Sequence, residues 1–221
     1  MSCKWDTIGE AGLQFFGKIS ASISHEIKNT LAIINENAGL LEDLSLMVDK
    51  GLPLDPERVK TLAGKVMAQI QRANGIVKKM NRFAHSVDDL VKTVDLKEIL
   101  DFVATLSARL ASMRGITLEL KPATSRVTIT TIPFFLENII WLCLNVSMDA
   151  VGREKTVGLV AEEWEKGPRI RFTQLEGLTD TLADRFPADP EKALLGALKA
   201  ELAVDFRAEE LVLYLPRDIG R

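Results

Sequence analysis

The chain has 221 residues, 47% hydrophobic and 27% charged, which is enough to bury the core of one large domain or two small ones. Its 28 basic and 31 acidic residues give a net charge of −3, so nothing in the charge favours nucleic acid or an anionic membrane as a partner. The sequence contains neither a signal peptide nor a run of about 20 apolar residues, so we expect a cytoplasmic protein. Cys3 and Cys143 match no metal-ligand spacing, and the apolar run around Cys143 predicts a buried thiol.

Two long helices are predicted in the first part of the chain. Apolar residues recur every three or four positions from Leu13 to Met47, which is typical of a helix with one buried stripe. This stripe comprises Phe16, Ile19, Ile23, Ile27, Leu31, Ile34, Ala38, Leu41 and Leu44. Gly51 and Pro53 end the pattern, and a second helix is predicted from Pro56 to about Leu90. The short turn makes the pair an antiparallel hairpin, and two copies would bury both stripes as a four-helix bundle in a homodimer.

After Val94 the pattern changes to alternating helices and strands. Helices are predicted at 96–113, 132–151 and 189–203, and strands at 116–120, 126–131, 157–163, 169–174 and 211–215. Such interleaving favours an α/β sandwich in which one mixed sheet lies under a helical layer. The predicted fold class is therefore α+β, with residues 1–92 as the helical hairpin and residues 93–221 as the sandwich.

The first helix carries the residues with the clearest chemical potential. His25 lies about 200° around the helix from Ile23, so we expect its imidazole to point away from the buried stripe. Asn29 follows one turn later on the same face, and Glu26 is adjacent in sequence. A neutral imidazole can attack an electrophile through one ring nitrogen while a base takes the proton from the other. A surface histidine beside a glutamate is, however, usually an ordinary solvated residue, and the spacing alone does not establish chemistry.

The residues around His25 form a longer motif. The string Phe16-Gly-Lys-Ile-Ser-Ala-Ser-Ile-Ser-His-Glu-Ile-Lys-Asn-Thr-Leu-Ala-Ile-Ile closely resembles the H-box of the dimerisation and phosphotransfer domain of sensor histidine kinases. Residues 72–84 are similar to the closing segment of that domain's second helix, and residues 94–100 to its junction with the catalytic domain. The resemblance extends over nearly the whole chain.

This resemblance implies roles for particular residues. His25 would accept the phosphoryl group, Glu26 would be the base that activates it, and Asn29 would take part in dephosphorylating a partner response regulator. The residues expected to contact that partner are Ser22, Lys28 and Ala32. Thr30 stands where the family usually has proline, which implies a straighter helix beside the histidine.

The second half resembles the ATP-binding domain of the same family without its nucleotide motifs. In the segment similar to the N-box helix, the two asparagine positions fall on Leu142 and Val146, or, if Asn145 is aligned instead, its partner position falls on Trp141. The family's Asp-x-Gly-x-Gly motif is replaced by Gln174-Leu-Glu-Gly-Leu, and residues 188–198 replace the glycine-rich lid. We therefore expect that ATP binding is lost and that the chain holds no cofactor or metal of its own.

Together these features predict a phosphorelay histidine phosphotransferase. It would accept and donate a phosphoryl group on His25 with the receiver domains of response regulators, which would supply the Mg²⁺. About a dozen residues precede the first predicted helix, so we expect the signal to come from another protein. Three alternatives remain: an ATP-dependent sensor histidine kinase, a pseudokinase scaffold that docks a response regulator, and a response-regulator phosphatase.

Overall fold

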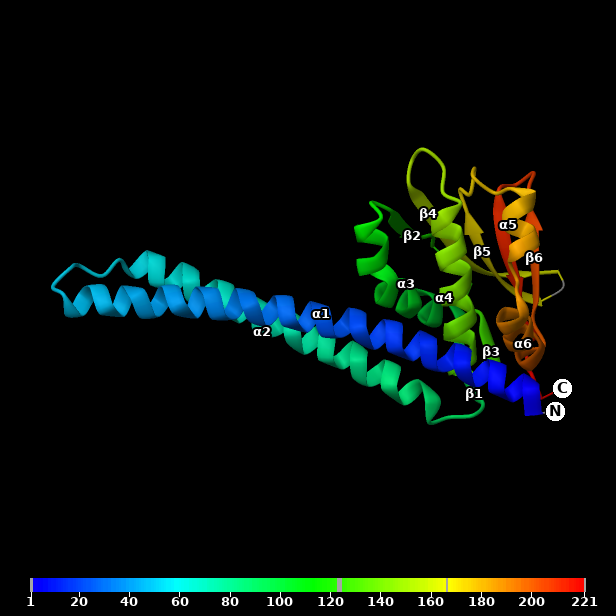
Figure 1. Ribbon diagram of the computed structural model, residues 1–221, viewed down its shortest axis with the longest axis horizontal. Helices are drawn as coiled ribbons and strands as arrows, with labels where there is room; N and C mark the ends of the chain where they lie inside the picture. The colour runs from blue at the N-terminus through cyan, green and yellow to red at the C-terminus, as the bar shows by residue number, and fades with distance from the viewer. Residues whose placement is uncertain (1, 123–124, 166, 221) are drawn as a thin grey trace. The chain divides into compact units, whose positions relative to one another are not determined.

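The computed structural model describes residues 2–122, 125–165 and 167–220 (Figure 1). The chain forms two compact units, one made of Met1–Ile19 with Ser86–Arg221 and the other of Ser20–His85. The first residues of the first helix therefore pack with the sandwich and not with the hairpin. The predicted order, a helical region followed by an α/β domain, is confirmed.

The unit Ser20–His85 is a helical hairpin built from α1 (Ser2–Asp49) and α2 (Pro56–Ala84). At the end of α1 the backbone of Gly51 adopts a φ of +83°, a left-handed conformation that glycine allows without strain. Asp55 then caps α2, because its side chain accepts hydrogen bonds from the backbone N–H groups of Glu57 and Arg58. The predicted break between the helices is therefore confirmed. After α2 the chain makes one 3-10 turn, His85–Val87.

The core of the hairpin includes two polar positions. Its buried residues are Ile23, Thr30, Asn37 and Leu44 on α1 and Leu62, Ile76 and Phe83 on α2. On α1 they recur every seven residues, which is the spacing of a helical seam. Both polar side chains bond back to their own helix: Thr30 Oγ1 donates to Glu26 O over 2.9 Å, and Asn37 Nδ2 to Ile33 O over 2.7 Å.

Part of the predicted stripe on α1 is wrong. Phe16 and Leu31 are 38% and 49% exposed, and Ala38 is also exposed. At Leu31 and Ala38 the reason is that the neighbouring polar residues Thr30 and Asn37 occupy the buried positions of the hairpin. At Phe16 the neighbouring Phe15 is the buried residue.

The sandwich is built around a mixed sheet. Its strands are β2 (Thr117–Leu120), β4 (Thr156–Trp164), β5 (Gly167–Thr173), β7 (Glu210–Tyr214) and β6 (Glu201–Asp205), in that spatial order. β2 pairs with β4 in parallel, and the other neighbours are antiparallel. A separate antiparallel pair joins β1 (Lys92–Asp95) to β3 (Thr128–Thr131). The helices are α3 (Leu96–Met113), α4 (Pro133–Asp149), α5 (Asp180–Arg185) and α6 (Asp189–Leu198).

The core of the sandwich lies between the sheet and α3, α4 and α6, which lie over one face of it (Figure 1). From the sheet it receives Val157, Leu159, Ala161, Ile170, Phe172, Leu211 and Leu213, each at most 3% exposed. α4 contributes Leu136, Ile139, Ile140, Cys143 and Leu144. The predicted burial of Cys143 is confirmed, and burial raises the pKa of its thiol far above the usual value. The residues that alternate with these on the strands point to the opposite, outer face of the sheet.

Candidate functional site

The H-box-like segment is regular helix. α1 continues without interruption through residues 22–32, and in it His25 and Asn29 are exposed while Glu26 is half-buried. Because residues four apart on a helix are neighbours on one face, the imidazole and the carboxamide lie next to each other one turn apart. The predicted exposure of His25 is confirmed, and its ring is open to a reacting group from solvent.

The residues expected to contact a partner surround His25. Ala32 and Lys28 are exposed, and Ser22 is half-buried. Ser22, His25, Asn29 and Ala32 follow one another at spacings of three, four and three residues, so they form one stripe along α1. Lys28 borders this stripe and contributes a positive charge beside it. We call these five residues the His25 face. Small neutral side chains on both sides of the imidazole leave room for another protein to approach it.

Thr30 supports the helix behind this face. Its side chain is 1% exposed, and its hydroxyl donates to the carbonyl oxygen of Glu26. A proline here could form neither the backbone nor the side-chain hydrogen bond. The predicted straight helix beside His25 is consistent with the uninterrupted course of α1.

In the sandwich, the N-box-like helix does not place an asparagine at both aligned positions in either alignment. Leu142 and Val146 are half-buried apolar residues. In the other alignment, Asn145 donates its carboxamide N–H to Trp141 O over 2.9 Å, and the partner position is Trp141, whose side chain has no oxygen ligand. Among the described residues, no group of three or more His, Cys, Asp or Glu side chains is placed to hold a metal ion.

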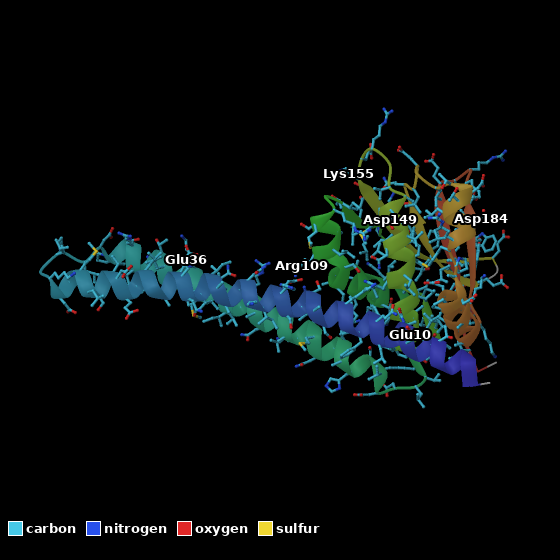
Figure 2. All side chains as sticks on the ribbon, viewed as in Figure 1. Glu10, Glu36, Arg109, Asp149, Lys155 and Asp184 are labelled. Atoms are coloured by element: carbon cyan, nitrogen blue, oxygen red, sulfur yellow. The ribbon has the colours of Figure 1, made fainter. Side chains whose placement is uncertain are left out.

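The first residues of α1 pack against this same helix. Phe15 is fully buried, with its ring 5.6 Å from Phe134 and 5.3 Å from Trp141 between centroids. A Cβ atom at Gly12 would lie 3.2 Å from the Phe134 ring, so the two helices approach closely there. Lys18 Nζ lies 5.2 Å from the centroid of the Trp141 ring. Figure 2 labels Glu10 on this part of α1.

A small cavity lies between these elements. It measures about 180 Å³ and is lined by Glu10 and Gln14 of α1, by Leu142 of α4 and by Glu191 of α6, among others. Pockets for drug-sized ligands usually measure about 300–1,000 Å³. Leu142, the first of the two aligned N-box positions, therefore lines a cavity smaller than this range.

The segment that replaces the Asp-x-Gly-x-Gly motif is packed against neighbouring backbone and side chains. Leu175 is fully buried, and Gly177 N donates to Ala150 O over 2.9 Å. A Cβ atom at Gly177 would lie 2.9 Å from that same oxygen, so only glycine fits this approach. The Glu176 carboxylate lies against Gly152. These contacts hold the segment against the end of α4.

The segment 188–198, which stands in place of the glycine-rich lid, is almost entirely the helix α6. α6 buries Ala193, Leu194, Leu195 and Leu198 in the core and ends at Lys199, whose φ of +49° is left-handed. The predicted helix at 189–203 is therefore too long, because β6 begins at Glu201. A packed helix does not offer the free backbone N–H groups that a phosphate-binding loop supplies.

One cluster was not singled out from the sequence. On the outer face of the sheet, Arg171 donates from Nε to Glu210 Oε2 over 2.7 Å and lies 3.4 Å from Glu162 Oε1. Glu162 also accepts from Arg169 Nε over 2.7 Å. The available signal was the alternation of charged and apolar residues along β4 and β5, together with Gly158 inside an apolar strand.

No helix within the described ranges is both long and apolar enough to cross a membrane. No protein-family model matches the sequence, and no curated protein matches it.

Three of the solved structures that resemble this chain are histidine kinases. The catalytic domain of ThkA is 8% identical with a TM-score of 0.48, and the similarity covers 58% of this chain and 96% of that one. Histidine kinase AdeS of Acinetobacter baumannii is 14% identical with a TM-score of 0.47, covering 87% of this chain and 98% of that one. ThkA in complex with the response regulator protein TrrA is 16% identical with a TM-score of 0.46, covering 93% of this chain and 63% of that one.

Proposed function

We propose that this chain is a histidine phosphotransferase of the histidine kinase type, which exchanges a phosphoryl group between His25 and the receiver domains of response regulators. The observation that carries the proposal is the exposed imidazole of His25 within an H-box-like string, next to Asn29 on an uninterrupted helix. The small residues of the His25 face leave space for a receiver domain to bring its aspartyl phosphate to the ring.

The chemistry needs few groups from this chain. One nitrogen of the neutral His25 ring attacks the phosphorus, and the bond from phosphorus to the aspartate oxygen breaks, which releases the receiver's carboxylate. The proton on the other ring nitrogen is stabilised by or passed to the carboxylate of Glu26. Donation to a second receiver is the same step in reverse. The Mg²⁺ that neutralises the phosphoryl charge would belong to the receiver domain.

Loss of ATP binding is the second part of the proposal. Leu142 and Val146 cannot ligate a hard cation, and the contacts of Gly177 hold the motif segment against α4. Without nucleotide the chain obtains its phosphoryl groups from another protein, which distinguishes a phosphotransferase from an ATP-dependent kinase.

Homodimerisation is the third part. The hairpin leaves large apolar side chains exposed along α2, namely Met67, Ile70, Val77 and Met80, at 37–56%. Together with the exposed Leu31 of α1 they provide apolar surface for a second copy, as in a four-helix bundle.

The test uses the full chain and a purified receiver domain that carries a labelled aspartyl phosphate. The label should move to the wild-type chain and not to His25→Gln, whereas the matched control His85→Gln, at the only other histidine, should accept it normally. Incubation with labelled ATP should leave the wild type unlabelled. Label on His25 from ATP would establish the kinase alternative, and receiver binding that survives His25→Gln with no transfer in the wild type would establish the scaffold.

A phosphatase activity is the second candidate, favoured by the exposed Asn29 one turn after His25. A carboxamide there can orient a water molecule towards the receiver's aspartyl phosphate. If this activity exists, Asn29→Ala slows the release of inorganic phosphate while the transfer of label to His25 continues.

A further inference from the structure

The outer face of the sheet contains a cavity of about 560 Å³. Its position follows from the strand register: Leu159 and Phe172 pair and point into the core, so the neighbouring pair Val160 and Arg171 points outward. The cavity is lined by Lys121, Arg171, Thr173, Gln174, Glu209 and Glu210 and by three apolar residues. It lies entirely within the sandwich unit and uses no residue of the His25 face.

Two buried polar atoms at this cavity have no partner in the described part of the chain. Thr173 is 7% exposed, and neither its Oγ1 nor Gln174 Oε1 makes a hydrogen bond. Buried polar groups are nearly always hydrogen-bonded, because an unmade bond costs free energy. Two of the charged residues in the lining are paired with each other, since Arg171 bonds to Glu210, and Arg171 also bonds to Glu162. The two free oxygen atoms lie beside this ion-pair cluster and take no part in it.

Gly158 brings these atoms together. A Cβ atom at Gly158 would lie 2.2 Å from Thr173 Oγ1 and 3.5 Å from Gln174 Oε1. It would also lie 3.1 Å from Lys121 Cε, so the lysine stem runs beside both oxygen atoms. No ion pair links the Lys121 ammonium to any described residue. Because this side chain is flexible and unpaired, it can swing to admit a ligand and then place its charge against it.

The backbone around the cavity is held in an unusual conformation. Gln174 and Glu209 both have left-handed φ values, +69° and +55°, which are uncommon for residues other than glycine. The two segments are joined because Leu175 N donates to Glu209 O over 3.0 Å. At Gln174 this conformation turns the side chain to the outer face, beside Thr173. Such strained positions concentrate at binding sites.

We propose that this cavity binds a small carboxylic acid with a neighbouring N–H or O–H donor, that is, an α-amino or α-hydroxy acid. The carboxylate would bind the Lys121 ammonium and the Thr173 hydroxyl, which donates to it. The adjacent donor of the ligand would bind Gln174 Oε1, which can only accept. The apolar lining, from Pro122, Val160 and Ala208, would contact a short side chain of the ligand.

Titration of the full chain with L-alanine, L-lactate and acetate, followed by NMR, tests the proposal. L-alanine or L-lactate should bind, and acetate, which lacks the second donor, should bind about tenfold more weakly. Thr173→Val keeps the shape of the side chain and removes the hydroxyl, so it should weaken binding about tenfold. Its Tm should be unchanged or higher, because an unpartnered hydroxyl does not stabilise the fold. Thr117→Val, on the exposed side of β2 and outside the cavity, is the matched control.

Three results would overturn the proposal: no binding of any of the three acids at millimolar concentrations, equal binding by wild type and Thr173→Val, or a lower Tm of Thr173→Val. The last result would show that the hydroxyl has a partner within the chain. His25→Gln should bind the acids as the wild type does, so this test is independent of phosphotransfer.

Discussion

The hydroxyl of Thr30 donates a hydrogen bond of 2.9 Å to the carbonyl oxygen of Glu26, one turn earlier on α1. Glu26 is the residue after His25, so this bond fixes the backbone directly beside the proposed phosphoryl acceptor. The same carbonyl would be left without its helical donor if residue 30 were proline. The turn that carries His25 is therefore built for a fixed geometry rather than for bending.

Thr30→Pro should test this arrangement. The variant loses both hydrogen bonds to Glu26 O and introduces a clash in a helix interior, so unfolding free energy measured in urea should fall by about 3 kcal/mol or more. Thr30→Val, the matched control, keeps the buried shape and the backbone hydrogen bond, so it should change stability by less than about 1 kcal/mol. A proline variant as stable as Thr30→Val would show that α1 already bends at this position.

Gly177→Ala should destabilise the sandwich. The new Cβ would lie 2.9 Å from the backbone oxygen of Ala150, and backbone cannot move aside as a flexible side chain can. We expect the free energy of unfolding, measured by chemical denaturation, to fall by about 1–3 kcal/mol. Gly64→Ala on α2 is the control, because nothing lies within 4 Å of its Cβ position. Because alanine favours a helix more than glycine does, Gly64→Ala should raise the free energy of unfolding by about 1 kcal/mol. If Gly177→Ala proved neutral, the segment would not be held against α4 as described.

Asp95 should contribute to the pH dependence of stability. Burial raises the pKa of this carboxyl, but the hydrogen bonds from Arg126 and from the backbone N–H groups of Glu98 and Lys97 lower it overall. A carboxyl with a lowered folded-state pKa stabilises the fold above its unfolded value of about 3.9. This contribution is lost as the pH falls through the folded-state pKa.

Asp95→Asn should therefore lower the free energy of unfolding more at pH 7 than at pH 3, when urea unfolding of the variant is compared with that of the wild type. The loss at pH 7 should be at most about 1 kcal/mol, because asparagine keeps a side-chain oxygen that caps α3 and loses only the charged pair with Arg126. Asp89→Asn serves as the control, since that carboxylate is 55% exposed in its pair with Lys92. An equal cost at both pH values would contradict the lowered pKa of Asp95.

Ile70→Asp should weaken the proposed homodimer. A charge in the apolar surface of α2 would be buried against the second copy, so the dimer dissociation constant in analytical ultracentrifugation should rise about tenfold or more. Leu52→Asp places the same change in the turn, where Leu52 is 47% exposed, and should leave the constant unchanged. A wild-type chain that sediments as a monomer at all concentrations would refute the dimer.

Local patterns predicted much of the fold. The bounds of α3, 96–113, agree with the prediction because Asp95 is an evident cap and the apolar spacing is regular. The start of α1 at Ser2 was not predicted, since Gly9, Gly12 and Gly17 weaken the helical pattern. Helix forms there because Ile8 and Phe15 are buried in the sandwich, and such tertiary packing cannot be read from local propensity.

Two short strands, β1 and β6, were missed for a related reason. β6 was assigned to the end of a helix, because Leu202 and Ala203 suit a helix and Lys199 gives no sign of its left-handed backbone. Pairing with β7 determines its conformation. β1 is a four-residue strand that depends on β3, more than 30 positions later in the chain. Non-local pairing of this kind leaves little trace in a single sequence.

The two candidate sites also differ in whether a local sequence pattern determines them. The exposure of His25 and Asn29 follows from helical geometry and could be predicted. The outer-face cavity could not, because it depends on the register that places Gly158 opposite Thr173 and on the backbone conformation of Gln174.

The most direct test of the central claim is a phosphate balance in one reaction. A receiver domain with a known amount of labelled aspartyl phosphate is mixed with the chain, and phosphoaspartate, phosphohistidine and inorganic phosphate are measured over time. We predict that the early loss of phosphoaspartate is matched by phosphohistidine that peptide mapping places at His25, and that a second, unphosphorylated receiver then removes it. Release of the label as inorganic phosphate without phosphohistidine at any time, or phosphohistidine at His85 alone, would contradict the account.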